Sequence, residues 1–251
     1  MNYDFDKNEL GLSQRALARI QKIIQRLSSL HCVDSFGVDF HKTGYMPYVA
    51  SMIITKRKED LTRLRRDGKV MTPLFHDDAA YNPGTFTLET SRSAANILAT
   101  WLTLNAFGQE GYQTLLGHSL EVSEKIRACI SAAEQEGLLV VNQEPFGCDV
   151  FVRCYRQGQN PRKTHEQELV DDNALEENNH YLNRFAKCLL PERAQTENNL
   201  SISKSSAASY THTGAPLPAL RIYPLNPFIT EDHAVAIVEK LKMAKKIFDH
   251  T

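Results

Sequence analysis

The residues best suited to chemistry lie in one short segment, Asp34 to Tyr48, which reads D-S-F-G-V-D-F-H-K-T-G-Y-M-P-Y. The pattern predicts a short apolar strand over Phe36 to Phe40, and a second apolar run, Ala50 to Thr55, follows the segment. Lys42 therefore falls between two strands of the kind found in buried sheets, where lysine is rarely present without a partner. A lysine in such a place can act as a nucleophile or form an imine through its primary amine.

The residues around Lys42 support this interpretation. His41 precedes it, and Gly44 would let two pieces of backbone approach each other closely. A rigid aromatic rim is expected from the residues that follow (Tyr45, Pro47 and Tyr48). Two alternatives remain open at this point: Lys42 as an ordinary solvated turn lysine, and His41 as a structural hydrogen-bonding histidine.

The composition is that of an ordinary globular protein and excludes several functional classes. The 251 residues carry a formal net charge of -1, which gives no electrostatic reason to expect binding to nucleic acid or to an anionic membrane. No apolar run approaches the roughly 18 residues that a membrane span needs, and the polar, acidic start does not resemble a secretory signal. The five cysteines are scattered and form no Cys-x-x-Cys pair. We therefore expect a cytoplasmic chain with reduced thiols and no metal site.

The first part of the chain is expected to supply the lysine-bearing strands and a buried helix. Ser13 could cap a helix that ends near Ser29, and Lys56 to Arg66 is typical of a charged surface helix. The stretch from Asp67 to Pro83 contains glycine and proline without a clean period, which predicts a long loop of the kind that often serves as a lid or binding loop. The helix expected from Ala94 to Phe107 is apolar on nearly all sides, so it should be buried.

Gly108 is a plausible boundary, with one domain over residues 1–107 and a second over residues 108–251. The second domain is expected to begin with a long amphipathic helix, Gln109 to Gln135. Residues 157–213 are mostly polar and are expected to form a partly mobile insertion, with Glu197 to Tyr210 as its Ser/Asn-rich mobile segment. The remaining expected elements are three strands (Leu138–Val141, Asp149–Tyr155 and Leu217–Leu225), a helix over His180–Leu190, and a last helix capped by Thr230.

The lysine segment resembles that of the group II pyridoxal-phosphate-dependent amino-acid decarboxylases. That family includes the glutamate, aromatic amino-acid, tyrosine, histidine and diaminobutyrate decarboxylases. Three further segments are similar to family segments in the same order and at similar spacing: Gly84–Arg92, Phe107–Tyr112 and Leu220–Pro227. The His-Lys segment is fairly specific, whereas the others are weak individually and persuasive together.

The resemblance implies an α/β protein of fold type I that uses pyridoxal 5'-phosphate to decarboxylate an L-amino acid. Residues 1–107 would be the carboxyl-terminal part of the cofactor-binding large domain, and residues 108–251 a small α+β domain. Lys42 would form the imine with the cofactor aldehyde, while His41 would lie near the cofactor phosphate. Asp39 occupies a position where some members have asparagine near the phosphate, although an aspartate does not favour direct contact with that group.

Relatives carry a catalytic tyrosine, the proton donor to the substrate carbon, in the loop that corresponds to residues 67–83. Val70 falls near the expected position, so either Tyr81, the tyrosine that this loop does contain, takes the role from a shifted position, or the donor is absent. His76 is a weaker candidate for this role. Arg92 would lie near the lysine and support the site through a carboxylate, or it would form a structural ion pair.

The family is about twice as long as this chain, so the resemblance implies a carboxyl-terminal half. The expected partners are the amino-acid substrate and either a second copy in a homodimer or a polypeptide that carries the amino-terminal half. A half of this kind would expose the apolar faces of its strands and should associate. Two alternatives stay open: an inactive remnant that serves as a scaffold or oligomerisation subunit, and a fold type I aminotransferase or lyase of another subclass.

Overall fold

The computed structural model describes residues 3–66, 83–86, 93–144, 147–189, 200 and 202–250. The chain divides into two compact units, which are described separately. The lysine unit comprises Ile24–Gln113, and the sheet unit comprises Asn2–Ile23 and Thr114–Thr251. This division differs from the expected boundary after residue 107 in two ways: it falls after residue 113, and residues 2–23 group with the carboxyl-terminal part.

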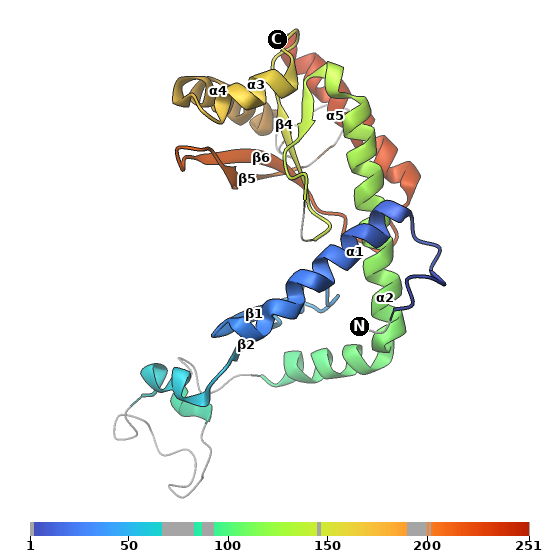
Figure 1. Cartoon of the computed structure of the whole chain (residues 1–251), viewed down its shortest axis with the longest axis vertical. Coiled ribbons are helices and arrows are strands. Elements are labelled where there is room, and N and C mark those ends of the chain that lie inside the picture. Colours follow the sequence, from blue (N-terminus) through green and yellow to red (C-terminus); the bar gives the residue numbers. More distant parts are fainter. Residues whose placement is uncertain are drawn as a thin grey trace, which may run out of the picture. The chain divides into compact units, whose positions relative to one another are not determined.

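An antiparallel hairpin forms the centre of the lysine unit (Figure 1). Strand β1 (Ser35–Asp39) pairs with strand β2 (Ser51–Thr55) from Ser35 opposite Thr55 to Asp39 opposite Ser51. Both strands lie where the apolar runs predicted them, and β2 exposes its apolar side chains, as expected for a half of this fold. Ile53 is 68% exposed, because within the described residues this sheet contains only the two strands of the hairpin. Among the described residues, this unit also contains three short 3-10 helices: η1 (Ser28–Cys32), η2 (Lys58–Leu64) and η4 (Pro83–Phe86).

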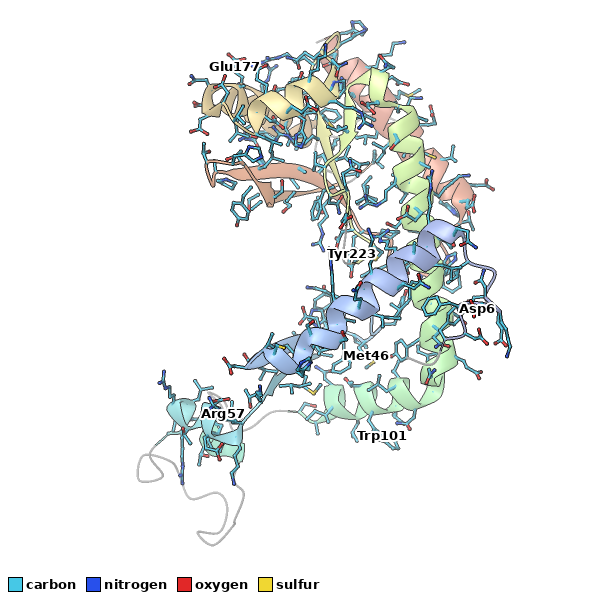
Figure 2. The ribbon with its side chains drawn as sticks, in the orientation of Figure 1. Asp6, Met46, Arg57, Trp101, Glu177 and Tyr223 are labelled. Atoms are coloured by element: carbon cyan, nitrogen blue, oxygen red, sulfur yellow. The ribbon has the colours of Figure 1, made fainter. Side chains whose placement is uncertain are left out.

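Helix α2 (Ala95–Ala132) begins in the lysine unit and contains a kink at Gly108, whose φ is 57° and ψ is -164°. Its first turns form a helix as predicted, but the expectation that they are buried is wrong. Trp101 is 61% exposed (Figure 2), and four neighbouring apolar residues are exposed with it: Ile97, Leu98, Leu102 and Leu104. The physical reason is that the described part of this unit supplies one hairpin and three short 3-10 helices, which is too little structure to surround a helix that is apolar on nearly all sides.

The sheet unit is built on a four-stranded antiparallel sheet in the order β3-β4-β6-β5. Its strands are β3 (Leu138–Val140), β4 (Val150–Cys154), β5 (Ser203–Tyr210) and β6 (Pro216–Ile222). Its helices are most of α1 (Gln14–Leu27), the remainder of α2, and then η5 (Glu134–Glu136), α3 (Pro161–Glu168), α4 (Asp172–Cys188) and α5 (Glu231–Asp249).

Alternate residues of β4 show how this unit is packed. Val150, Val152 and Cys154 belong to one buried apolar cluster, to which α2, α4 and α5 also contribute. Side chains along a strand alternate between its two faces, so Arg153 lies on the opposite face. It meets a buried carboxylate of α3 there, at Glu168. The helix predicted to begin after Thr230 is confirmed, because the hydroxyl of that residue accepts a hydrogen bond from the amide of the third helical residue.

The region expected to be a partly mobile insertion contains regular structure. Residues 203–210, which were expected to lie in a mobile segment, instead form β5, and both α3 and α4 precede that strand within the region. β5 escaped prediction because its sequence, S-K-S-S-A-A-S-Y, has neither the alternation nor the branched residues typical of strands. Its strand conformation is stabilised by hydrogen bonding with β6 at one edge of the sheet.

The cysteines, metal ligands and long helices can be judged within the described residues. All five cysteines are unpaired, and burial raises the pKa of Cys154 to about 12 and that of Cys148 to about 11. These two thiols are therefore protonated and unreactive at neutral pH. Across the same residues, no group of three or more metal-ligating side chains is present, and no helix is long and apolar enough to cross a membrane.

Candidate functional site

Lys42 lies in a compact turn directly after β1. Its amide donates to the carbonyl of Asp39 at 3.1 Å, and its own carbonyl accepts from the amide of Tyr45 at 3.0 Å. The amide of Met46 donates to the carbonyl of Phe40 at 3.1 Å, which closes the turn. The backbone of Lys42 is therefore fixed by hydrogen bonds, whereas its side chain is 43% exposed and accessible to solvent.

Gly44 makes the close backbone approach that the sequence predicted. A Cβ atom at this position would lie 2.5 Å from the carbonyl oxygen of Phe40 and 2.8 Å from the Cα of Phe40. The carbonyl of Gly44 accepts a hydrogen bond of 2.9 Å from the hydroxyl of Tyr112 in α2, and burial raises the pKa of that hydroxyl. This contact could not be predicted from the sequence, in which Tyr112 is recognisable only as an inward-facing residue of a helix.

Asp39 holds the amine of Lys42. One carboxylate oxygen of Asp39 lies 2.8 Å from Nζ of Lys42, and the other accepts a 2.7 Å hydrogen bond from the hydroxyl of Ser51. The hydrogen bond with Lys42, followed by that from Ser51, holds the pKa of Asp39 below its ordinary value. Ser51 was missed by the sequence analysis, although it directly faces Asp39 across the predicted hairpin. The expected membership of Asp39 in the cofactor site stays a prediction.

His41 is anchored to the opposite strand. Its amide donates to the carbonyl of Ala50 at 3.1 Å, and its Nδ1 lies 3.0 Å from the same oxygen. The imidazole also faces the ring of Tyr48, with 4.2 Å between ring centroids and 36° between planes. The structural hydrogen bond considered as the alternative role of His41 is therefore present, and its contact with the phosphate stays a prediction.

Three other predicted site residues, Tyr81, His76 and Arg92, lie outside the described residues, as does Val70. The structure therefore brings together Asp39, His41, Lys42 and Ser51 and leaves the proposed proton donor unplaced. All four residues lie on one hairpin, which explains why a single stretch of sequence revealed three of them.

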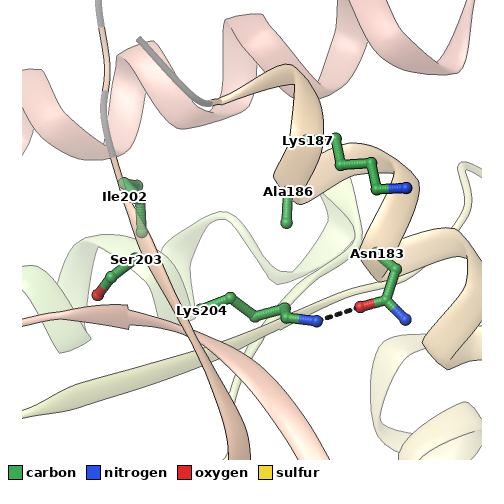
Figure 3. A pocket seen from close by; sticks show the side chains of 6 residues that line it. All are labelled: Asn183, Ala186, Lys187, Ile202, Ser203 and Lys204. Carbon is green, nitrogen blue, oxygen red and sulfur yellow. Dashed lines mark hydrogen bonds between the residues drawn. The ribbon is translucent and has the colours of Figure 1, made fainter. Parts of the chain in front are cut away.

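A cavity lined by two lysines lies in the sheet unit, beside the end of α4 and the start of β5 (Figure 3). This cavity has a volume of about 410 Å³ and is lined by Asn183, Ala186, Lys187, Ile202, Ser203 and Lys204. Lys204 donates to the amide oxygen of Asn183, and the six lining residues include no carboxylate or imidazole. It is a weaker candidate for lysine chemistry than the turn at Lys42, and it offers a control lysine.

Comparison with known proteins agrees with the sequence analysis. The family model described as the pyridoxal-dependent decarboxylase conserved domain matches residues 17–152. The chain is 29% identical over 115 residues to the L-tyrosine decarboxylase of Enterococcus faecium, covering 43% of this chain and 18% of that protein. It is 24% identical over 206 residues to the aspartate 1-decarboxylase of Aliivibrio fischeri, covering 82% of this chain and 35% of that protein.

Solved structures show the same fold. The crystal structure of mouse CSAD matches with a TM-score of 0.61 at 16% identity, covering 92% of this chain and 44% of that one. The predicted fold type I architecture is thereby confirmed, and this chain spans less than half the length of each of the three proteins. The family match covers more than half of the chain, so the protein belongs to the pyridoxal-dependent decarboxylase family, whose cofactor is pyridoxal 5'-phosphate.

Proposed function

We propose that this chain carries the lysine-bearing part of a pyridoxal-phosphate-dependent amino-acid carboxy-lyase, with Lys42 as the residue that binds the cofactor aldehyde. The observation that carries the proposal is the position of Lys42 inside the family match, on an ordered turn that leaves its amine accessible. The proposal extends to residues 1–107 as the lysine-bearing part of the large domain and to residues 108–251 as the small domain.

The residues around Lys42 fit the aldehyde end of pyridoxal phosphate. An exchangeable imine requires a primary amine that a carbonyl carbon can approach, and the 43% exposure of Lys42 allows that approach. When bound, the cofactor supplies an electron sink for the carbanion left after carbon dioxide departs. Lys42 would attach the cofactor, and His41, fixed by Ala50 and Tyr48, would contribute to the phosphate end.

The remaining roles extend beyond the described residues. We assign the proton donor to Tyr81 on the strength of its position in the loop. We keep Asp39 as a member of the cofactor site. Its contact with Lys42 favours a role in holding the amine over a contact with the phosphate. The substrate is an L-amino acid, and relatives with names as different as tyrosine and aspartate decarboxylase do not select one.

The exposed apolar surface of the lysine unit supports a protein partner. Ile53 of β2 and Trp101 of α2 are exposed by 68% and 61%, and exposed apolar residues gathered on neighbouring elements mark interaction surfaces. The partner would be a second copy of this chain or a polypeptide that supplies the remaining layers of the fold. We further propose that the protein acts in the cytoplasm, in keeping with its five free thiols.

A second candidate function is a scaffold or oligomerisation subunit without catalysis. The specific observation that favours it is the ion pair at 2.8 Å between Asp39 and Lys42, because a lysine held as a salt bridge can serve the hairpin alone. The two functions differ in whether Lys42 reacts with an aldehyde.

The deciding experiment is to add pyridoxal 5'-phosphate to the chain, record the absorbance band at the edge of the visible range, reduce with borohydride and map the labelled peptide. We expect label on Lys42, loss of the reducible band in Lys42→Ala, and an unchanged band in Lys204→Ala. A Lys42→Ala protein that keeps the reducible band would refute the assignment. A folded wild-type chain that gives no band would favour the scaffold.

A further inference from the structure

The last residue pair of the hairpin beside Lys42 is a hydrogen-bonded couple of polar side chains. Asp39 ends β1 and Ser51 begins β2, and the two residues face each other across the sheet. The hydroxyl of Ser51 donates to one carboxylate oxygen of Asp39 at 2.7 Å. Because the pairing of the two strands fixes both Cα positions, this hydrogen bond sets the direction of the carboxylate.

The carboxylate is turned toward the amine of Lys42. Its second oxygen lies 2.8 Å from Nζ, and the amide of Lys42 also donates to the carbonyl of Asp39 at 3.1 Å. Lys42 is therefore tied to Asp39 through both backbone and side chain. The titratable groups around this turn include His41, whose Nδ1 is 3.4 Å from the Ser51 hydroxyl, and Tyr112, whose hydroxyl bonds the carbonyl of Gly44. Tyr45 lies in the turn itself, and the ring of Tyr48 packs against His41.

We propose that Asp39, oriented by Ser51, is a positioning residue that holds the amine of Lys42 and restrains its reaction with carbonyl compounds. The identity of the natural carbonyl compound rests on the proposed function, whereas the positioning does not. An ammonium group that donates to Asp39 has no lone pair for attack. It must release a proton to water and turn away before its nitrogen forms a bond to a carbonyl carbon, from which the oxygen leaves as water.

Removal of the carboxylate should therefore let Lys42 react at lower pH. Asp39 and Lys42 are both about two-fifths exposed, so solvent weakens their attraction and the effect is modest. In Asp39→Asn we expect the pH profile of the Lys42 reaction to move to lower pH, so that methylation of Lys42 at a fixed pH rises by up to about fivefold. In Ser51→Ala the carboxylate stays but loses its orientation, so a smaller shift in the same direction is expected.

The test uses formaldehyde and cyanoborohydride, which methylate reactive amines, over a series of pH values. Peptide mapping gives the extent of methylation at Lys42 relative to Lys7, which also pairs with an aspartate three residues away and lies outside the hairpin. Ser35→Ala, at the opposite end of the same hairpin, is the matched control and should leave the profile unchanged.

An Asp39→Asn profile that coincides with the wild-type profile overturns the inference, and so does a Ser35→Ala shift as large as that of Asp39→Asn. If Asp39→Asn does not fold, Ser51→Ala decides, because that variant keeps every charge in the turn, and an unshifted profile then counts against the inference. Parallel reactions with pyridoxal 5'-phosphate and borohydride separate the two proposals. A shifted formaldehyde profile without pyridoxal capture at Lys42 supports the positioning and refutes the proposed function. Capture of pyridoxal 5'-phosphate at Lys42 without any shift of the formaldehyde profile supports the proposed function and refutes the positioning.

Discussion

Replacement of Glu168 by glutamine should strongly destabilise the sheet unit. Glu168 is fully buried and pairs with the equally buried Arg153, whose Nε donates to one carboxylate oxygen at 3.1 Å. The same carboxylate accepts from Tyr155 at 2.7 Å and from Asn178 at 3.0 Å, and it lies 2.9 Å from Nδ1 of His165. Glutamine preserves the size of this side chain but removes its charge and turns one acceptor into a donor.

The expected magnitude follows from what Arg153 retains. Breaking a buried ion pair by removal of one partner costs about 3 to 5 kcal/mol, since the other charge is left uncompensated. Arg153 keeps hydrogen bonds of 2.8 Å to the side-chain oxygen of Asn179 and 2.9 Å to the carbonyl of Pro218. These acceptors lower the penalty, so we expect a loss of about 3 kcal/mol at neutral pH, near the low end of that range.

The loss should depend on pH in a defined direction. Burial acts to raise the pKa of Glu168, but the hydrogen bond with His165 and the charge of Arg153 outweigh it and hold this pKa below its ordinary value. A carboxyl with a depressed pKa in the folded state contributes stability above its unfolded pKa and loses it as the pH falls through the folded value. The difference between wild type and Glu168→Gln should therefore be largest near neutrality and shrink in acid below about pH 4.

The assay is urea unfolding at several pH values, with hydrogen exchange of peptides from β4 and β6 to restrict the readout to the sheet unit. Glu166→Gln, an exposed neighbour on α3, is the matched control and should change stability by less than about 0.5 kcal/mol. The reasoning is wrong if Glu168→Gln loses less than about 1 kcal/mol, a value expected of surface pairs. A loss that stays constant between neutral and acidic pH would also contradict it.

Two further predictions concern the lysine unit. Gly44→Ala should destabilise the Lys42 turn by about 1 to 3 kcal/mol, because the new Cβ would lie 2.5 Å from the carbonyl oxygen of Phe40. Hydrogen exchange of the hairpin amides measures this, and Gly37→Ala, whose Cβ would meet nothing nearer than 3.9 Å, is the control that should exchange as wild type. The chain should also associate in sedimentation velocity, and Trp101→Gln should weaken association several-fold, whereas Phe228→Gln, 83% exposed in the sheet unit, should not. A sharp wild-type monomer would contradict this expectation.

Local sequence signals predicted the helices and strands whose own residues include a capping residue or a regular apolar pattern. Thr230 caps α5, and the apolar stripe of α2 after Gly108 is buried at Leu120 and Ile126, as expected. Helix α4 was predicted from residue 180 but begins at Asp172, where the carboxylate of Asp171 accepts from the amides of residues 173 and 174. Helix α3 and strand β5 were missed because their sequences are polar and their stability comes from tertiary contacts.

The residues of the candidate site also differ in whether the local sequence could predict them. Asp39, His41 and Lys42 were found because they are contiguous and their types suggest chemistry. Ser51 lies 12 residues from its partner, and Tyr112 lies 68 residues from the carbonyl that it binds. Such contacts depend on strand register and on how a helix packs, and neither follows from residue types in a single sequence.

The exposed first part of α2 shows what an apolar pattern does and does not encode. A helix that is apolar on nearly all sides forms its backbone hydrogen bonds locally, whereas its burial depends on surfaces that the pattern does not specify. Before Gly108 these side chains are exposed, and beyond it they pack into a core. Asn96 of this helix donates to the carbonyl of Val49 at 2.6 Å, which ties the helix to the loop between β1 and β2. A partner surface that covers the first part of α2 would therefore lie beside the loop that carries Lys42. Association with a partner and the chemistry of Lys42 would then involve the same unit of this protein.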